Sequence, residues 1–260
     1  RWPAPRTPIF SMCGGFFAKV SLYCNRKSYF RLNFHENRSL RNMTDTYRHK
    51  GLRKLLVDTI RRKGISDPNV LDAVEKVPRH FFFDSSFLEF AYEDKPFPIG
   101  AGQTISQPYT VAFQTELLRI HKGDRILEIG TGSGYQACIL HEMGAKVFTI
   151  ERQKILFEKT TKLLTKLGYA GIKTFYGDGY KGLSAFAPFH KILVTAAAPY
   201  VPEALLEQLR PGGILVIPVG PDEVQIMTTI TRKPDGTFQK QEHGAFRFVP
   251  MLEDKEGNNK

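Results

Sequence analysis

A glycine-rich stretch, Glu128-Ile129-Gly130-Thr131-Gly132-Ser133-Gly134-Tyr135, follows a short apolar run at residues 125–129 and precedes a helical pattern at residues 135–142. Its three glycines let the backbone turn sharply and let a ligand come close to the main chain. A strand, a loop and a helix in this order form the first unit of an open α/β sheet, which binds ligands at the carboxyl ends of its strands. The stretch therefore predicts a ligand-binding α/β fold.

The chain on either side of this stretch alternates between strand and helix patterns. We expect strands at 125–129, 146–150, 172–176, 191–195 and 214–218, and helices at 135–142, 153–167 and 202–209. Such alternation predicts a mostly parallel sheet with helices on both faces. Two further strands, at about 224–232 and 237–248, surround a Pro-Asp-Gly turn, so we expect antiparallel strands at the C-terminal edge.

The residues before the sheet predict a helical and irregular cover. Helix patterns occupy 46–63, 69–77 and 109–120, and the segment 79–102 between them is irregular and rich in aromatic residues. We divide the chain into an N-terminal extension (1–42), a helical and irregular cover (43–123), a core (124–252) and a polar tail (253–260).

The positive charge of the sequence is uneven. The 260 residues carry a net charge of +11, but the first 42 residues hold eight basic residues and one acid, which leaves only +4 for residues 43–260. We expect translation to start at Met43, with residues 1–42 as upstream sequence or a disordered tail. An arginine-rich transit peptide is the alternative for this segment.

Cysteine usage and hydropathy exclude other classes of protein. The three cysteines, Cys13, Cys24 and Cys138, form neither a disulfide framework nor a CxxC metal motif. No stretch of about 18 consecutive apolar residues is present, as a transmembrane helix would require. We therefore expect a cytoplasmic protein without a metal and without a membrane segment.

Acidic residues stand at the ends of three consecutive predicted strands. Glu128 begins the glycine loop, Glu151 follows the next strand 17 positions after Gly134, and Asp178 follows the third. An acid at the place of Glu151 accepts hydrogen bonds from ribose hydroxyls, and Asp178 could accept one from an adenine amino group. Glu128 suits a cationic ligand and disfavours a diphosphate. The pattern predicts S-adenosylmethionine as cofactor, and a dinucleotide oxidoreductase is the weakest reading because the loop is GxGxG rather than GxGxxG.

With these residues in place, the sequence resembles the protein-L-isoaspartate (D-aspartate) O-methyltransferase family over residues 46–252. The matching stretches are Pro-Ile-Gly-Ala-Gly-Gln-Thr-Ile-Ser-Gln-Pro (98–108), 128–137, Thr-Ile-Glu-Arg (149–152), Gly-Asp-Gly (177–179), 194–199, 215–220 and Phe-Val-Pro (248–250). The segment 103–108 is the most specific of them. The resemblance implies a Rossmann-like class I SAM-dependent methyltransferase sheet.

The resemblance also implies an activity and its site residues. The methyl group of S-adenosylmethionine would pass to the α-carboxylate of L-isoaspartyl residues in damaged proteins and peptides, with D-aspartyl residues as a second substrate, and the ester would return through a succinimide toward aspartate. The implied catalytic residue is Ser106. The implied cofactor-binding residues are Thr104, Ile105, Ser106, Glu128, Gly130, Thr131, Gly132, Ser133, Gly134, Glu151, Arg152, Asp178 and Gly179. The implied substrate-binding residues are Pro98, Ile99, Gly100, Ala196, Ala197 and Val249.

The chemistry of this reaction explains why no Ser/His/Asp arrangement is needed. A carboxylate with a pKa of about 4 is already ionised at pH 7, so no general base is required. Ser106 could aim the carboxylate with its hydroxyl, or it or Gln107 could cap the helix that starts at Pro108. His190 stands where many relatives have an acid, and we assign it no role.

Two other functions stay open at this point. A methyltransferase acting on RNA or a small molecule would share the glycine loop but not need residues 104–108. A non-catalytic, basic nucleic-acid-binding module would explain the net charge. We expect isoaspartyl proteins and peptides as substrates and neither nucleic acid nor membrane as a partner. We also expect the protein to be a monomer.

Overall fold

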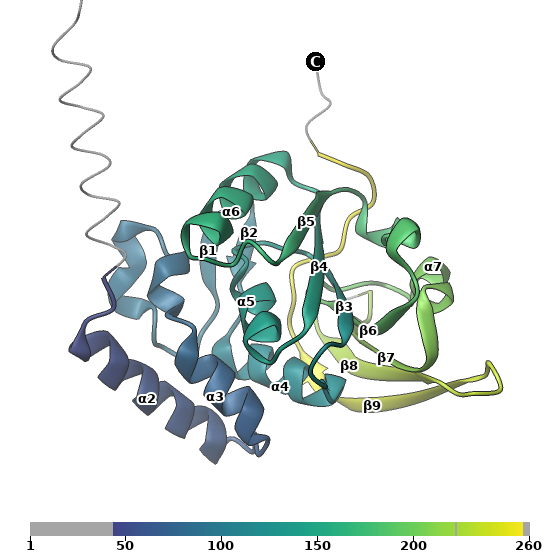
Figure 1. Ribbon diagram of the computed structural model, residues 1–260, viewed down its shortest axis with the longest axis horizontal. Coiled ribbons are helices and arrows are strands. Elements are labelled where there is room, and N and C mark those ends of the chain that lie inside the picture. The colour runs from purple at the N-terminus through teal and green to yellow at the C-terminus, as the bar shows by residue number, and fades with distance from the viewer. Residues whose placement is uncertain (1–43, 222, 257–260) are drawn as a thin grey trace, which may run out of the picture. The chain divides into compact units, whose positions relative to one another are not determined.

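The computed structural model describes residues 44–221 and 223–256 (Figure 1). Its main sheet has seven strands in the order β5-β4-β3-β6-β7-β8-β9. Strands β5 to β7 are mutually parallel, whereas β8 is antiparallel to β7 and β9 to β8. The strands are β3 (Arg125–Ile129), β4 (Lys146–Glu151), β5 (Lys173–Tyr176), β6 (Phe189–Val194), β7 (Leu209–Val219), β8 (Gln225–Arg232) and β9 (Phe238–Phe246). The predicted parallel sheet with an antiparallel C-terminal edge is confirmed.

Helices connect these strands and form the cover. The α-helices are α2 (Tyr47–Arg62), α3 (Pro68–Lys76), α4 (Pro108–Leu118), α5 (Tyr135–Glu142), α6 (Lys154–Lys166) and α7 (Glu203–Glu207). Shorter 3₁₀ turns are η1 (Arg79–Phe82), η2 (Ser85–Phe90), η3 (Gly179–Lys181) and η4 (Ser184–Phe186). Local sequence explains two of the helix starts: Thr46 and His49 form a capping box on α2, and Asp67 caps α3 ahead of Pro68.

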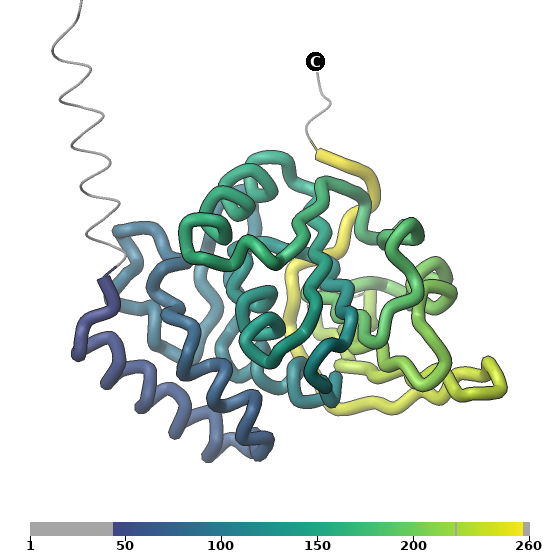
Figure 2. The backbone as a smooth tube through the Cα atoms, in the orientation of Figure 1, coloured from purple at the N-terminus to yellow at the C-terminus, as the bar shows by residue number. Residues whose placement is uncertain are grey.

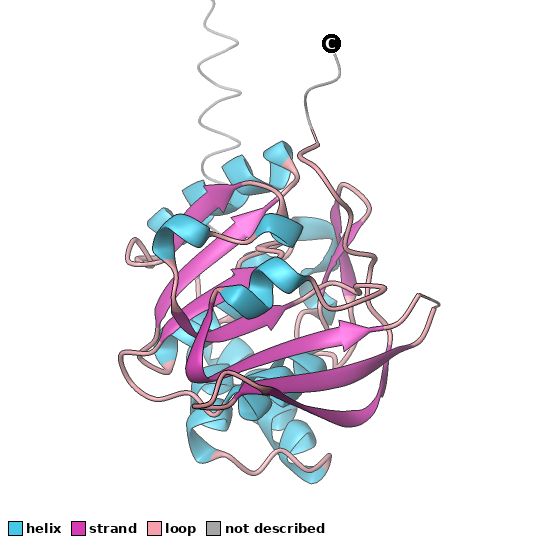
Figure 3. Cartoon of the chain, turned by 90° about the vertical axis from the view of Figure 1, so that its right-hand side faces the viewer, coloured by secondary structure: helices cyan, strands magenta, loops and turns pink. Residues whose placement is uncertain are grey.

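The two faces of the sheet are covered unequally. On one face, side chains of α2 to α6 pack with alternate residues of the strands, such as Ile126 and Leu193, in one hydrophobic core. On the other face, Leu127 and Ile192 pack with α7, η4 and the loops around them. Figure 3 shows the twisted sheet with helices on either side of it. Helices do lie on both faces, but those over the second face are short.

Two local features differ from the expected elements. The aromatic cover contains a small hairpin, β1 (Phe97–Gly100) paired with β2 (Gln103–Ile105), whose turn holds Gly100, Ala101 and Gly102 at φ of 91°, 52° and 65°. The segment Pro211-Gly212-Gly213, which lies between the helix expected at 202–209 and the strand expected at 214–218, bulges within β7. Its residues lie between the pairs Phe189–Leu209 and Lys191–Ile214, so the chain loops out without leaving the sheet.

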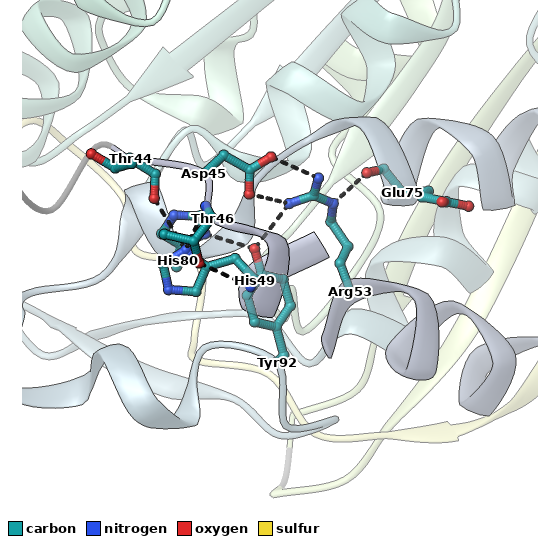
Figure 4. A network of polar contacts seen from close by, with 8 residues as sticks. All are labelled: Thr44, Asp45, Thr46, His49, Arg53, Glu75, His80 and Tyr92. Carbon is teal, nitrogen blue, oxygen red and sulfur yellow. Dashed lines mark hydrogen bonds and ion pairs between the residues drawn. The ribbon is translucent and has the colours of Figure 1, made fainter. Parts of the chain in front are cut away.

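A network of polar side chains ties the start of the described chain to the cover (Figure 4). The guanidinium of Arg53 on α2 donates to both carboxylate oxygens of Asp45, at 3.1 and 3.0 Å, to the hydroxyl of Tyr92 and to the carbonyl of Glu75. Tyr92 in turn lies 2.6 Å from Nδ1 of His80. Because Arg53 and His80 are buried, these contacts fix α2 against α3 and the aromatic segment.

Candidate active site

A cleft lies at the carboxyl ends of β3 and β4, under β2 and the C-terminal segment. That segment, yellow in Figure 2, returns from β9 toward the start of α6. The cleft brings together twelve of the residues predicted for the site: Thr104, Ile105, Ser106, Gly130, Thr131, Gly132, Ser133, Glu151, Arg152, Gly179, Ala196 and Val249. The glycine loop and the segment 104–106 thus share one cavity although they are far apart in the sequence.

A threonine that directly follows β6 forms hydrogen bonds with the start of the glycine loop. The hydroxyl of Thr195 donates to the carbonyls of Ile129, at 2.9 Å, and of Gly130, at 2.8 Å. A Cβ atom on Gly130 would lie 2.6 Å from that hydroxyl oxygen, and the residue has a φ of 97°. Position 130 therefore requires glycine for both space and conformation.

Glu151 connects the end of β4 with the same loop. Its Oε2 accepts a hydrogen bond from the main-chain N–H of Gly132, and its Oε1 accepts one from Gln153, both at 2.9 Å. Burial raises the pKa of this carboxyl, although hydrogen bonds from Gln153 and Gly132 act in the opposite direction. A carboxylate offers about four acceptor positions. Two of them are used, so Glu151 can still accept bonds from a ligand such as a ribose.

The side chain of Glu128 does not line the cleft, although it is among the cofactor-binding residues expected from the sequence. Its side chain is fully buried and does not line the cleft, and within the described residues neither carboxylate oxygen has a hydrogen-bond partner. Successive side chains of a strand point to opposite faces. Glu128 therefore points to the same face as Ile126, toward the core that contains α5, whereas Ile129 beside it packs on the other face. Burial raises the pKa of Glu128 to about 8.

Asp178 and Arg152 have protein partners of their own. Asp178 caps η3, because its carboxylate accepts from the main chain of Tyr180 at 2.9 Å, and it lies 3.4 Å from the ammonium of Lys181. Only its neighbour Gly179 lines the cleft. Arg152 does line the cleft, but its guanidinium donates to the carbonyls of Glu253 and Asp254 and pairs with Glu256 at 3.2 Å. Arg152 thus holds the C-terminal segment in place.

A second, open groove of about 1100 Å³ adjoins the cleft. It is lined by residues of α4, the end of β9 and the segments beside them. Four residues, Thr104, Ser106, Thr195 and Val249, line both cavities and form the wall between them. Helix α4 has Gln107 as its N-cap residue and no side-chain capping bond. The hydroxyl of Ser106 therefore stands in this shared wall without serving as the helix cap.

The remaining predicted residues lie near these cavities without lining them. Ile99 of β1 packs over Gly132, since its Cδ1 atom lies 3.5 Å from where a Cβ would be. Pro98 and Gly100 belong to the same hairpin strand. Ala197 is bonded through its main chain to Val249 and Met251, and Gly134 is the N-cap residue of α5 with a φ of 84°.

Several cleft residues had no assigned role in the sequence. They are Gln103, Val111, Ile129, Tyr135, Gln136, Ile150, Gln153, Thr195, Pro250, Met251 and Leu252. Some stand in the stretches that carry the family resemblance, such as Thr195, and that signal could have found them. Met251 and Leu252 follow the last such stretch, and only the return of the C-terminal segment across the sheet brings them to the cleft.

Metal and membrane features can be examined in residues 44–221 and 223–256. One group, Asp45, His49 and His80, has potential ligand atoms within 4.8 Å of one another. Both oxygens of Asp45 are already bonded to Arg53, which would also repel a cation (Figure 4). None of the helices described is long and apolar enough to span a bilayer.

Comparison with known proteins identifies the fold and the family. The family described as protein-L-isoaspartate(D-aspartate) O-methyltransferase matches residues 51–256, which include both cavities. The chain belongs to this family. Membership agrees with the resemblance expected from residues 98–108, and the predicted enzyme class is confirmed.

Individual relatives support the assignment. A protein-L-isoaspartate O-methyltransferase of Flavobacterium johnsoniae is 60% identical over 213 residues, covering 82% of this chain and 100% of the relative. One from Christiangramia forsetii is equally similar, with 60% identity over 213 residues and the same coverage of both chains.

Solved structures of the same family have the same fold. One protein-L-isoaspartate O-methyltransferase superposes with a TM-score of 0.70 at 29% identity, covering 76% of this chain and 65% of the other. A candidate member from Plasmodium falciparum, solved with S-adenosyl-L-homocysteine, gives a TM-score of 0.68 at 27% identity and covers 77% of this chain and 98% of its own. The chain therefore has the fold of SAM-dependent methyltransferases.

Proposed function

We propose that this chain transfers the methyl group of S-adenosylmethionine to the α-carboxylate of L-isoaspartyl residues, and of D-aspartyl residues, at the place where the cleft and the groove adjoin. The observation that carries the proposal is that Thr104, Ser106, Thr195 and Val249 line both cavities. A cofactor in the cleft and a peptide in the groove would meet beside these residues, where the carboxylate can contact the methyl carbon directly and displace the sulfur in line.

The residues that line the cleft suit S-adenosylmethionine, which supplies a methyl group on positively charged sulfur when bound. The loop at Gly130 and Gly132 has no side-chain bulk, so the main chain can contact the ligand, and Glu151 retains acceptor positions for ribose hydroxyls. Glu128 is buried without a bonded partner among the described residues, and with a pKa of about 8 it is mostly neutral at pH 7 until a cationic ligand beside it lowers that pKa. Direct contacts of Glu128 and Asp178 with the cofactor stay predictions.

The groove fits an extended peptide whose nucleophile needs no activation. The carboxylate of an isoaspartyl residue is ionised at pH 7, so the protein has only to position it and exclude water. The hydroxyl of Ser106, which does not cap α4, can donate a hydrogen bond to that carboxylate. Its assignment as the catalytic residue is part of this proposal.

A pair of peptides that differ only in isoaspartate versus aspartate tests the proposed function. With a tritiated methyl donor, label should enter the isoaspartyl peptide and not its aspartyl twin. RNA and a panel of small metabolites serve as acceptors for the competing methyltransferase activities. Equal labelling of both peptides, or labelling of RNA alone, would refute the proposal.

The proposal extends to the localisation of the protein, which we place in the cytoplasm, and to its oligomeric state. We propose a monomer that binds no nucleic acid, because residues 43–260 carry only +4 of the net charge. Light scattering would measure the mass in solution, and a filter-binding assay with single- and double-stranded nucleic acid would test the second point. A dimer mass, or tight binding by a chain that begins at Met43, would contradict these statements.

A further inference from the structure

The acidic or basic residues that line the groove are all basic. They are Lys63, which follows α2, His243 on β9 and Arg247 just after β9, and the described lining contains no aspartate or glutamate. The groove also contains the aromatic side chains of Tyr109, Phe113, Phe246 and Phe248. A peptide in the groove would therefore meet apolar surface and positive charge but no negative side chain.

Two of the three basic groups are already engaged. The ammonium of Lys63 lies 2.5 Å from the carboxylate of Asp94, which compensates its charge. His243 contacts the hydroxyl of Thr229 at 2.9 Å, and burial, assisted by the charge of Arg119, lowers its pKa. At pH 7 His243 is therefore mostly neutral.

Arg247 is the basic residue of the groove whose charge no described carboxylate compensates. Its side chain is exposed, and within residues 44–221 and 223–256 no carboxylate lies within ion-pairing distance of it. It stands between Phe246 and Phe248, two residues before Val249 in the wall that the groove shares with the cleft. An acidic side chain of a bound peptide would find in Arg247 a partner that is not already occupied.

We propose that Arg247 is a specificity residue, which makes isoaspartyl substrates with aspartate or glutamate close to the damaged site better than those with lysine or arginine. This inference rests on the proposed function, because it assumes that the groove holds the peptide. A groove of about 1100 Å³ exceeds the usual size of a small-molecule site, so several residues of the peptide can lie in it. Only the residues beside the isoaspartate need to reach Arg247.

Three isoaspartyl peptides that differ only in the flanking residues, glutamate, glutamine or lysine, test the inference. We expect kcat/KM to fall in the order glutamate, glutamine, lysine, with roughly a fivefold range between the first and last at low salt. The difference should lie in KM rather than in kcat, because the ion pair is equally present before and during methyl transfer. Raising the salt concentration should narrow the range, because added ions screen exposed charges.

Substitutions at Arg247 separate this inference from the proposed function. Arg247→Gln should remove the preference and Arg247→Glu should reverse it, each measured within one variant as the ratio of kcat/KM for the glutamate peptide to kcat/KM for the lysine peptide. The control is Lys162→Glu, which makes the same change of charge on the exposed face of α6, away from both cavities, and should keep the original order. Melting temperatures verify that each variant is folded.

The outcomes are distinguishable. If the wild-type chain methylates none of the three isoaspartyl peptides, the proposed function itself fails. If it methylates all three with equal kcat/KM, or if Arg247→Glu keeps the original order, the role of Arg247 is wrong and the function stands. A reversal by Lys162→Glu as large as that by Arg247→Glu would also overturn the inference, since the preference would then come from net charge.

Discussion

The carboxylate of Glu151 and the main-chain N–H of Gly132 are joined by a hydrogen bond of 2.9 Å. This bond links the end of β4 to the glycine loop after β3, across 19 residues of sequence. It places the acceptor atoms of the acid beside the main chain that we propose contacts the cofactor. If Glu151 binds the ribose as proposed, the geometry of the loop and the affinity for the cofactor are coupled through this side chain.

Replacing Glu151 by glutamine should weaken cofactor binding. The change removes the charge and one acceptor, and hydrogen bonds to charged groups contribute about 1.5–3 kcal/mol each, so the loss should be roughly tenfold or more. Isothermal titration with S-adenosylhomocysteine measures it. Glu158→Gln on the exposed side of α6 is the matched control and should bind normally. Unchanged affinity in a folded Glu151→Gln variant would contradict the ribose-binding role.

Removing the hydroxyl of Ser106 should affect methyl transfer more than cofactor binding. Because Ser106 lies in the shared wall and does not cap α4, Ser106→Ala loses a donor to the substrate carboxylate without loosening the helix. We expect methylation of an isoaspartyl peptide to fall at least several-fold while titration with the cofactor is unchanged. Ser85→Ala, an exposed serine in η2 outside both cavities, is the control. Wild-type turnover by Ser106→Ala would remove this residue from the catalytic set.

Adding a methyl group at Gly130 should disrupt the loop. In Gly130→Ala the new Cβ would lie 2.6 Å from the hydroxyl of Thr195, at a φ of 97°. We expect a loss of about 1–3 kcal/mol in the free energy of unfolding from steric strain, together with weaker cofactor binding. Gly51→Ala on α2, where no atom lies within 4 Å of the new Cβ, should instead gain about 0.5–1 kcal/mol. Urea unfolding of the two variants measures both effects, and equal stability would refute the steric argument.

The buried carboxyl of Glu128 should make stability depend on pH. Its pKa is raised from 4.5 to about 8 by burial, so between these values the folded state holds a proton that the unfolded state has lost. Stability then falls as pH rises, by at most about 1.4 kcal/mol per pH unit, and the loss is complete above the folded pKa. Glu128→Gln cannot ionise, so its advantage in free energy of unfolding over the wild type should grow between pH 5 and pH 8. Parallel slopes of the two proteins would contradict this prediction.

Most of the fold follows from local patterns in the sequence. The helix at 135–142 has its predicted bounds, because Gly134 starts it and a second glycine, Gly144, follows its end. The hairpin of β1 and β2 was missed because its three-residue strand is too short for a periodic signal. Likewise Pro211-Gly212-Gly213 carries the composition of a turn, and only pairing with β6 reveals it as a bulge.

The site was less predictable than the sheet, for a geometric reason. An acid at a strand end reaches the crevice only if its side chain points to the correct face, and a one-residue difference reverses the face. Glu151 lines the cleft whereas Glu128, also at a strand end, points into the core. Similarly, Met251 and Leu252 reach the cleft through contacts with distant residues such as Ala197, which no local pattern encodes.

The wall formed by Thr104, Ser106, Thr195 and Val249 suggests a route to selective inhibitors. A single compound that joins an adenosine to an isoaspartyl dipeptide through a short tether could occupy both cavities at once. Its two halves would share one loss of translational freedom, so its affinity should exceed that of either half. Because the same four residues line both cavities, the tether length that gives the tightest binding would report how far apart the two ligands are held.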